Sequence, residues 1–160
     1  MANTYSQVYL QFVFAVKGRQ SLIKPEHNDE LQKYITGIVQ NRKQKMLAIN
    51  NMPDHLHLFV GFGTTMSMAD FMEEVKAISS KFINENGWVK GKFEWQRGYG
   101  VFSYSRSHID NVIKYIKNQQ VHHQRTTFEE EYLDFLRKFE VEFDDRYLFE
   151  WIEQKFIDLK

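Results

Sequence analysis

The stretch Pro53–Val60 (PDHLHLFV) constrains the fold most, because two histidines flank a leucine inside an apolar run. In a β-strand successive side chains point to opposite faces, so His55 and His57 would share one face while the leucines enter a core. Two neutral imidazoles on one face of a strand can hold one metal ion. A strand with two hydrogen-bonded histidines at an exposed edge would show the same pattern, so this stretch does not decide alone.

A second motif lies in residues 108–124. Apolar residues recur there at helical spacing and predict one helix with an apolar face against a sheet. Tyr115 and Gln119 are four residues apart and are therefore neighbours on the surface of that helix. The helix can lay both side chains along a groove beside the sheet, with His122 one turn further on as an additional candidate. If the two histidines of the strand face this groove, the motifs form one site.

The remaining patterns predict a small α+β domain of the ferredoxin-like or RRM-like type, an antiparallel sheet with helices on one face and a C-terminal helical tail. Strand patterns occupy residues 5–16, 46–51, 55–60 and 93–104, and helix patterns occupy residues 25–39, 67–87, 108–124, 128–139 and 147–157. Ser67 and Ser107 are each followed three residues later by an aspartate, which predicts two capped helix starts.

The composition excludes several kinds of site and location. The chain has no cysteine, which excludes disulfides and thiolate ligands, so a metal must use histidine, carboxylate, amide or water. No apolar run approaches the ~20 residues needed to span a membrane. The N-terminus lacks the features of a signal peptide. We therefore expect a soluble cytoplasmic protein without a membrane partner.

A formal net charge of zero conceals an asymmetry along the chain. Residues 129–160 carry a net charge of −6, which leaves +6 on residues 1–128. A basic body with an acidic tail is compatible with a nucleic-acid partner. Eight basic residues in predicted loops or at strand ends are the candidate nucleic-acid contacts: Lys17, Arg19, Arg42, Lys43, Lys45, Lys90, Lys92 and Arg97.

Together the two motifs suit phosphodiester chemistry. A tyrosine hydroxyl with its usual pKa of about 10 is a weak nucleophile. A divalent ion can polarise the scissile phosphate and neutralise charge in the transition state, and two imidazoles with one amide leave positions free for phosphate and water. Attack by Tyr115 would give a covalent phosphotyrosine intermediate.

With these motifs in place, the sequence resembles the small single-tyrosine HUH transposases of bacterial insertion sequences, which act on single-stranded DNA. The resemblance covers nearly all of residues 5–124. It rests on the stretches YLQFVFAVKGR at 9–19, DHLH at 54–57, WQRGYG at 95–100 and YIKNQ at 115–119. We expect residues 1–125 to form the catalytic domain and residues 126–160 an acidic helical extension of the same domain.

The resemblance implies a role for each site residue. His55 and His57 match two metal ligands, and Gln119 matches the third. Tyr115 matches the nucleophile that becomes joined to a DNA 5′-phosphate. The resemblance also implies Mg²⁺ as cofactor, with Mn²⁺ able to substitute, and single-stranded or hairpin DNA as partner. It further implies a homodimer in which each tyrosine helix can serve the partner's histidine pair.

Two alternative functions stay open at this point. The first is a related HUH endonuclease, or a domesticated relative that only nicks DNA, although the small size and single tyrosine favour a transposase. The second is a non-enzymatic ferredoxin-like RNA-binding module that stacks bases on aromatic side chains. That module would expose aromatic residues on the sheet face and would have no metal site.

Overall fold

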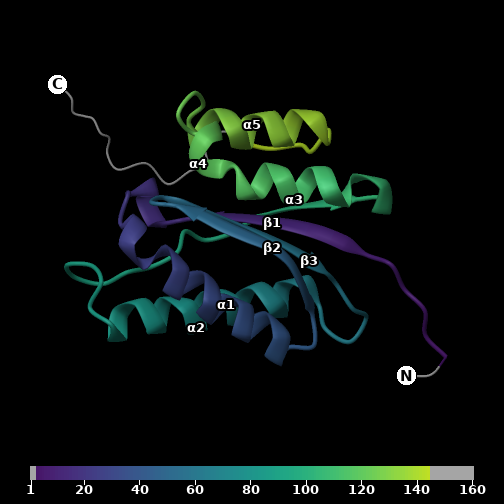
Figure 1. The fold of residues 1–160 in the computed structure, drawn as a ribbon, viewed down its shortest axis with the longest axis horizontal. Helices are drawn as coiled ribbons and strands as arrows, with labels where there is room; N and C mark the ends of the chain where they lie inside the picture. The colour runs from purple at the N-terminus through teal and green to yellow at the C-terminus, as the bar shows by residue number, and fades with distance from the viewer. Residues whose placement is uncertain (1–2, 145–160) are drawn as a thin grey trace.

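The computed structural model describes residues 3–144, which form an antiparallel sheet between two layers of helices (Figure 1). The strands are β1 (Tyr9–Ala15), β2 (Lys45–Met52), β3 (His55–Gly61) and β4 (Gly100–Tyr104). Their order in the sheet is β2-β3-β1-β4, and every neighbouring pair is antiparallel. This arrangement confirms the α+β class and the small antiparallel sheet predicted from the sequence.

The helices form two layers, one on each face of the sheet, so the prediction that helices cover only one face is wrong. Helices α1 (Asn28–Asn41) and α2 (Met68–Glu85) share one face, whereas α3 (Ile109–Lys117), α4 (Gln119–His122) and α5 (Phe128–Lys138) cover the other (Figure 1). Short 3-10 turns η1 (Lys17–Arg19), η2 (Pro25–His27) and η3 (Arg106–His108) precede α1 or α3. Within residues 3–144 no helix combines the length and apolarity that crossing a membrane requires.

Alternation along the strands gives the sheet two different faces. On the α1/α2 face the strands supply apolar side chains to the main core: Leu10, Phe12, Phe14, Leu56, Leu58 and Val60. Burying each such side chain contributes about 1.5–3 kcal/mol of transfer free energy. The intervening residues, including His55 and His57, point towards α3, α4 and α5. The predicted division of the histidine strand into a core face and a histidine face is confirmed.

The predicted helix over 108–124 is interrupted, and the interruption has a local cause. Asn118 adopts φ −97° and ψ 19°, which ends α3 and separates it from α4. The side chain of Asn50 on β2 donates to the carbonyl of Ile116 at 2.8 Å and to that of Lys117 at 3.3 Å. Carbonyls at a helix end lack partners within the helix, so this amide from the sheet satisfies them where the helix stops.

Other element boundaries also differ from the sequence prediction. The pattern at 93–104 is a strand only from Gly100, because Phe93 is tied through its backbone to the side chain of Asn84 on α2. Ser67 caps α2 as predicted. Ser107 does not cap α3; it lies within η3, and its hydroxyl lies near Ser105 and His108. The helix predicted at 147–157 lies outside the described residues.

Candidate active site

The two histidines of β3 lie side by side on the buried face beneath α3, α4 and α5. Both are fully buried, and their ring centroids are 5.2 Å apart. The Nδ1 atom of His55 lies 2.7 Å from a carboxylate oxygen of Asp54, and that of His57 lies 2.8 Å from the Gln11 amide nitrogen. Because each Nδ1 atom has an outer partner, both Nε2 atoms are left to face the centre of the site.

Gln11 fixes His57 through a short chain of polar groups. Its amide oxygen accepts a hydrogen bond of 2.9 Å from the hydroxyl of Tyr104 on β4. An amide can present either its oxygen or its nitrogen to an imidazole, and a phenol can donate or accept. The Gln11–Tyr104 pair can therefore hold either tautomer of His57, including the one whose Nε2 lone pair is free for a metal.

Tyr115 and Gln119 reach the histidines from the two sides of the break between α3 and α4. Gln119 is fully buried, and its amide oxygen lies 3.3 Å from Nε2 of His55. Tyr115 is partly buried, with its ring centroid 6.0 Å from that of His57. The structure thus brings together all four residues that the sequence singled out for chemistry. They lie together within a single chain.

A fifth residue, Glu131 on α5, occupies the centre of this cluster. Its Oε1 atom lies 3.2 Å from Nε2 of His57 and 3.0 Å from Nε2 of His123. Its Oε2 atom accepts hydrogen bonds from the Gln119 amide and from the Tyr115 hydroxyl. Four residues could hold a metal ion here, with ligand atoms all within 4.8 Å of one another: His55, His57, His123 and Glu131.

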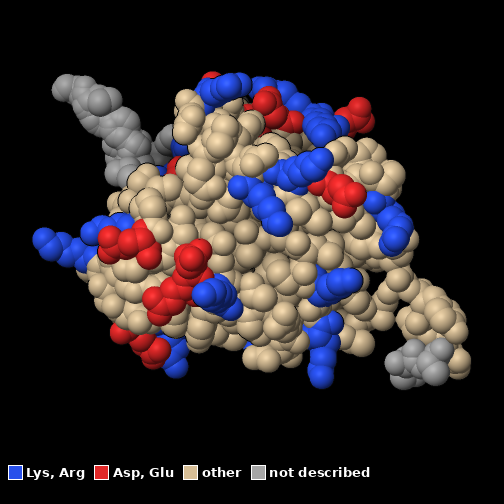
Figure 2. All heavy atoms as spheres, in the orientation of Figure 1, with Lys and Arg blue, Asp and Glu red and all other residues tan. Residues whose placement is uncertain are grey.

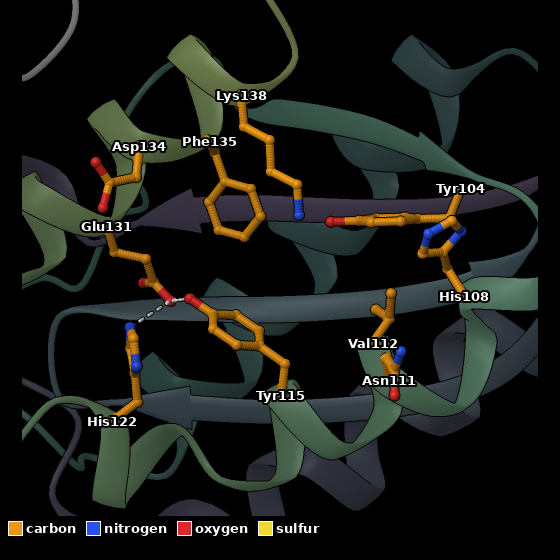
Figure 3. Close-up of a pocket in the computed structure, with 10 residues that line it drawn as sticks. All are labelled: Tyr104, His108, Asn111, Val112, Tyr115, His122, Glu131, Asp134, Phe135 and Lys138. Atoms are coloured by element: carbon orange, nitrogen blue, oxygen red, sulfur yellow. Dashed lines mark hydrogen bonds and ion pairs between the residues drawn. The ribbon is translucent and has the colours of Figure 1, made fainter.

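A cavity of about 360 Å³ opens between α3 and α5 and leads to Tyr115 (Figure 3). Figure 3 shows the Tyr115 hydroxyl and the Glu131 carboxylate meeting at one end of this cavity, with His122 beside them. Lys138 projects from α5 towards the cavity, which Tyr104 on β4 also lines. The tyrosine hydroxyl is therefore approachable from outside, although the histidines behind it are buried.

Comparison with known proteins decides which family this geometry belongs to. The family described as "Transposase IS200 like" matches residues 4–119. The chain belongs to this transposase family. A curated relative, the ISDra2 transposase TnpA of Deinococcus radiodurans, is 23% identical over 120 residues, which cover 71% of this chain and 84% of the relative.

Two solved structures show the same fold as this IS200-like transposase. A crystal structure from Deinococcus radiodurans R1, classed as a transposase, aligns with a TM-score of 0.58 at 22% identity and covers 73% of this chain and 94% of its own. A REP-associated tyrosine transposase bound to a REP hairpin aligns with a TM-score of 0.56 at 17% identity, over 76% of this chain and 72% of its own.

Burial and the Glu131 charge control ionisation in this transposase's site. Burial opposes the charge of Glu131, but hydrogen bonds from three histidines outweigh it and hold the pKa of that carboxyl far below its usual range. Burial lowers the pKa of His57; for His55 it is outweighed by Asp54 and Glu131, and the pKa is raised. Burial first, and then the Glu131 charge, raise the pKa of Tyr115. The carboxylate is thus charged and the phenol protonated at neutral pH.

Five of the eight basic residues predicted to contact nucleic acid lie at the end of the sheet that carries the histidines. These five are Lys17, Arg19, Lys90, Lys92 and Arg97. The backbone of Lys17 bonds to Glu94 at 3.0 Å, and that of Gln96 bonds to Ala15 at 2.8 Å. Ala15 pairs directly with His55 across β1 and β3. These contacts hold the segment between α2 and β4 close to the histidine end.

The other three basic residues, Arg42, Lys43 and Lys45, lie at the opposite end of the sheet. Lys45 pairs with Gly61, the last residue of β3, and Arg42 forms an ion pair with Glu74. On the side of the molecule that Figure 2 shows, basic side chains are spread over both helix layers rather than gathered in one patch, with acidic ones among them. The eight predicted residues therefore do not share one continuous surface.

Sequence reasoning missed Glu131 and His123. The pattern over residues 128–139 predicts only a helix of the acidic extension, yet Glu131 falls three residues after Phe128 and four before Phe135, on the buried apolar face of α5. A charge on an apolar helix face was the available signal. His122, the predicted additional member, lies at the margin, with its Nε2 3.9 Å from Glu131. His123 lies at the centre instead. It is four residues after Gln119, and its backbone N–H donates to the Gln119 carbonyl, so the two side chains lie on the same side of the helix.

Proposed function

We propose that this chain is a transposase that cleaves and rejoins single-stranded DNA at the ends of an insertion sequence, with Tyr115 as nucleophile. One observation carries the proposal: in a member of the IS200-like transposase family, the Tyr115 hydroxyl lies in the same buried cluster as His55, His57 and Gln119. We further propose that residues 1–125 form the catalytic domain and that residues 126–160 extend it.

The residues of the cluster fit a divalent metal ion. The two histidines present Nε2 atoms towards one point, and the Gln119 amide oxygen lies close to one of them. Imidazole nitrogens combined with amide and carboxylate oxygens accept Mn²⁺ and Mg²⁺, and the chain offers no thiolate. We propose that His55, His57 and Gln119 hold Mg²⁺, with Mn²⁺ able to replace it.

The proposed reaction is a transesterification at one phosphodiester. The Tyr115 oxygen attacks the phosphorus, the bond from tyrosine oxygen to phosphorus forms, and the bond from phosphorus to the DNA 3′-oxygen breaks. Tyr115 loses its hydroxyl proton, and the leaving oxygen gains one and becomes a free 3′-hydroxyl. The DNA 5′-phosphate stays on the tyrosine, so a later attack by a 3′-hydroxyl can reseal the strand.

The raised pKa of Tyr115 supports a role for a divalent ion in the proposed reaction. Without one, burial and the neighbouring carboxylate keep the phenol protonated, which disfavours attack. When bound, a divalent ion would neutralise charge on the phosphate and favour ionisation of the nearby phenol. The protein's own part is to hold the hydroxyl: Glu131 accepts its hydrogen bond, and Asn50 anchors the helix end beyond it.

Hairpin or single-stranded DNA is the proposed partner. The REP-associated tyrosine transposase that shares this fold is bound to a REP hairpin, which supports a similar ligand here. The RNA-binding alternative predicts aromatic side chains exposed on the sheet face. In the described residues α1 and α2 cover one face, and α3 and α5 cover Phe59 and Phe102 on the other. Base stacking on the sheet is therefore not favoured.

A covalent-adduct assay tests the proposal. The protein is incubated with Mn²⁺ or Mg²⁺ and end-labelled single-stranded DNA from the sequences that flank its gene, then run on a denaturing gel. We expect an adduct that is lost in Tyr115→Phe and in the presence of a chelator. Tyr34→Phe, on the opposite side of the sheet, is the matched control and should keep the adduct. An adduct in the Tyr115→Phe variant would overturn the assignment.

A further inference from the structure

We infer that Glu131 completes the metal centre: one carboxylate oxygen is a ligand to the divalent ion, and the other holds the hydroxyl of Tyr115. The inference rests on the proposed function, and it assigns a role to a residue beyond the segment that matches the family, residues 4–119. It makes α5 part of the site that performs the reaction.

The position of one oxygen supports a ligand role. Atom Oε1 of Glu131 lies 3.0 Å from Nε2 of His123, 3.2 Å from that of His57 and 3.5 Å from that of His55. Two ligand atoms that each lie ~2.0–2.1 Å from one ion, at angles of 90–110°, are about 2.8–3.4 Å apart. The separations of this oxygen from His123 and His57 are therefore already those of atoms that share one ion, and its separation from His55 is only slightly longer.

The second oxygen connects this centre to the nucleophile. Oε2 of Glu131 accepts a hydrogen bond of 2.9 Å from the Gln119 amide and another from the Tyr115 hydroxyl. A single carboxylate thus spans from the converging histidines to the tyrosine. With Glu131 as a ligand, one carboxylate would hold both the ion and the attacking oxygen, and positioning of this kind is how a nucleophile gains rate.

The start and the packing of α5 fix the position of Glu131. Thr127 and Glu130 form a capping box that fixes the start of the helix. Phe128 and Phe135 then bury the same face on the sheet, and Phe128 stacks on His55 with ring centroids 4.0 Å apart. Glu131 lies between them and is only 3% exposed. A carboxylate is costly to bury unless it is paired or bound to a metal, and this one faces three imidazoles.

The carboxylate also changes which ion the centre prefers. Imidazole nitrogens suit Zn²⁺ and related ions, whereas carboxylate oxygens suit Mg²⁺ and Mn²⁺. Removing the carboxylate should therefore weaken Mn²⁺ binding more than Zn²⁺ binding. A glutamate that only neutralised the histidines in the fold would not change this selectivity, so the ratio of the two affinities separates a ligand from a structural counter-charge.

The experiment measures metal binding, not activity. Mn²⁺ and Zn²⁺ are titrated separately into the full-length protein by isothermal calorimetry, and the free Mn²⁺ signal is checked by electron paramagnetic resonance. Glu131→Gln should weaken Mn²⁺ binding by at least about 10–100-fold, the loss that follows when only an outer partner of a metal ligand is removed. Asp134→Asn, an exposed acid one turn along α5, is the control and should bind normally. Melting curves in chelator verify folding, and Glu131→Asp, which keeps the charge, should bind between wild type and Glu131→Gln.

The outcomes separate this inference from the proposed function. Equal or tighter Mn²⁺ binding by Glu131→Gln, with binding lost in His57→Ala, would overturn the inference and leave the proposed centre intact. An unchanged ratio of Mn²⁺ to Zn²⁺ affinity would also overturn it. If the wild-type protein binds neither ion, both the inference and the proposed metal centre fail, and the adduct assay shows whether Tyr115 still acts without one.

Discussion

The two faces of the sheet are built from the same strands but have opposite character. On the α1/α2 face Phe12 is fully buried and packs against the rings of Phe62 and Phe71. The preceding residue, Gln11, is equally buried on the other face, where it bonds to His57 and Tyr104. Because side chains alternate along a strand, one residue can stabilise the core while the next supports the site.

The polar face is stable because its buried groups have partners. Asn50 bonds to the end of α3 and exchanges hydrogen bonds of 2.9 and 3.1 Å with Gln120. Gln119 and Glu131 bond to each other. Leaving such a group unpaired costs about 1–3 kcal/mol, whereas a cavity in the apolar face costs more. Substitutions on the two faces should therefore differ in size and in kind.

The largest effect is expected from truncating the apolar face. Phe12→Ala should lower the free energy of unfolding by about 3–5 kcal/mol, because it removes a buried ring and leaves a cavity. Gln11→Ala, one residue away, should lower it by about 1–3 kcal/mol. Urea unfolding followed by circular dichroism gives both values. If Gln11→Ala proved as destabilising as Phe12→Ala, the division of labour between the faces would be wrong.

A smaller effect on stability, with a larger one on function, is expected at Asn50. Asn50→Ala should lower the free energy of unfolding by about 1–3 kcal/mol, because two carbonyls at the end of α3 lose their donor. Adduct formation should slow more than this loss explains, since Tyr115 and Gln119 flank that helix end. Asn86→Ala is the control, an exposed amide that bonds to a carbonyl at the end of α2. Equal adduct rates for both variants would contradict the positioning role.

How much of the fold and of the site the sequence predicts depends on whether the cause lies in the local chain. Period-two alternation at 53–60 and helical spacing at 115–119 depend only on the local chain, and they predict that the two histidines share one face of the strand and that Tyr115 and Gln119 are neighbours on the helix. The break at Asn118 could not be predicted, because it depends on Asn50, which lies 68 residues earlier. Glu131 was missed for a similar reason: its neighbours Glu129 and Glu130 made it look like one of several acids at a helix start.

Basic residues at the two ends of the sheet should differ in their effect on DNA binding. Lys17 lies beside the histidine end, and Lys43 lies roughly 20 Å away along β3, at the other end. If DNA approaches the site, Lys17→Gln should reduce the slope of log affinity against log salt by about 0.7 for single-stranded DNA, the value for one lost phosphate contact. Lys43→Gln should leave it unchanged. Fluorescence anisotropy over a salt series measures both slopes, and equal slopes would show that the distinction between the ends does not matter for binding.

The last prediction concerns whether the polar face of one chain is sufficient for DNA cleavage. The sequence resemblance implied a homodimer with composite sites, and we keep the homodimer as a proposal. In the structure, however, Tyr115 bonds to Glu131, and Glu131 bonds to the histidine His57 of the same chain. All the proposed groups are then supplied in cis. Mixing His57→Ala with Tyr115→Phe should therefore restore no cleavage, since every chain lacks one group.

This prediction needs proof that the chains exchange. Light scattering establishes whether a dimer forms, and two fluorescent labels, one on each variant, report exchange by energy transfer before DNA is added. Recovery of a fraction of wild-type cleavage in the exchanged mixture would show that Tyr115 reaches the partner subunit's histidines. The α3–α4 segment would then have to leave Asn50 and Glu131, and Asn50→Ala should increase that recovery by releasing it. Absence of recovery after verified exchange would leave each polar face as a complete site belonging to its own chain.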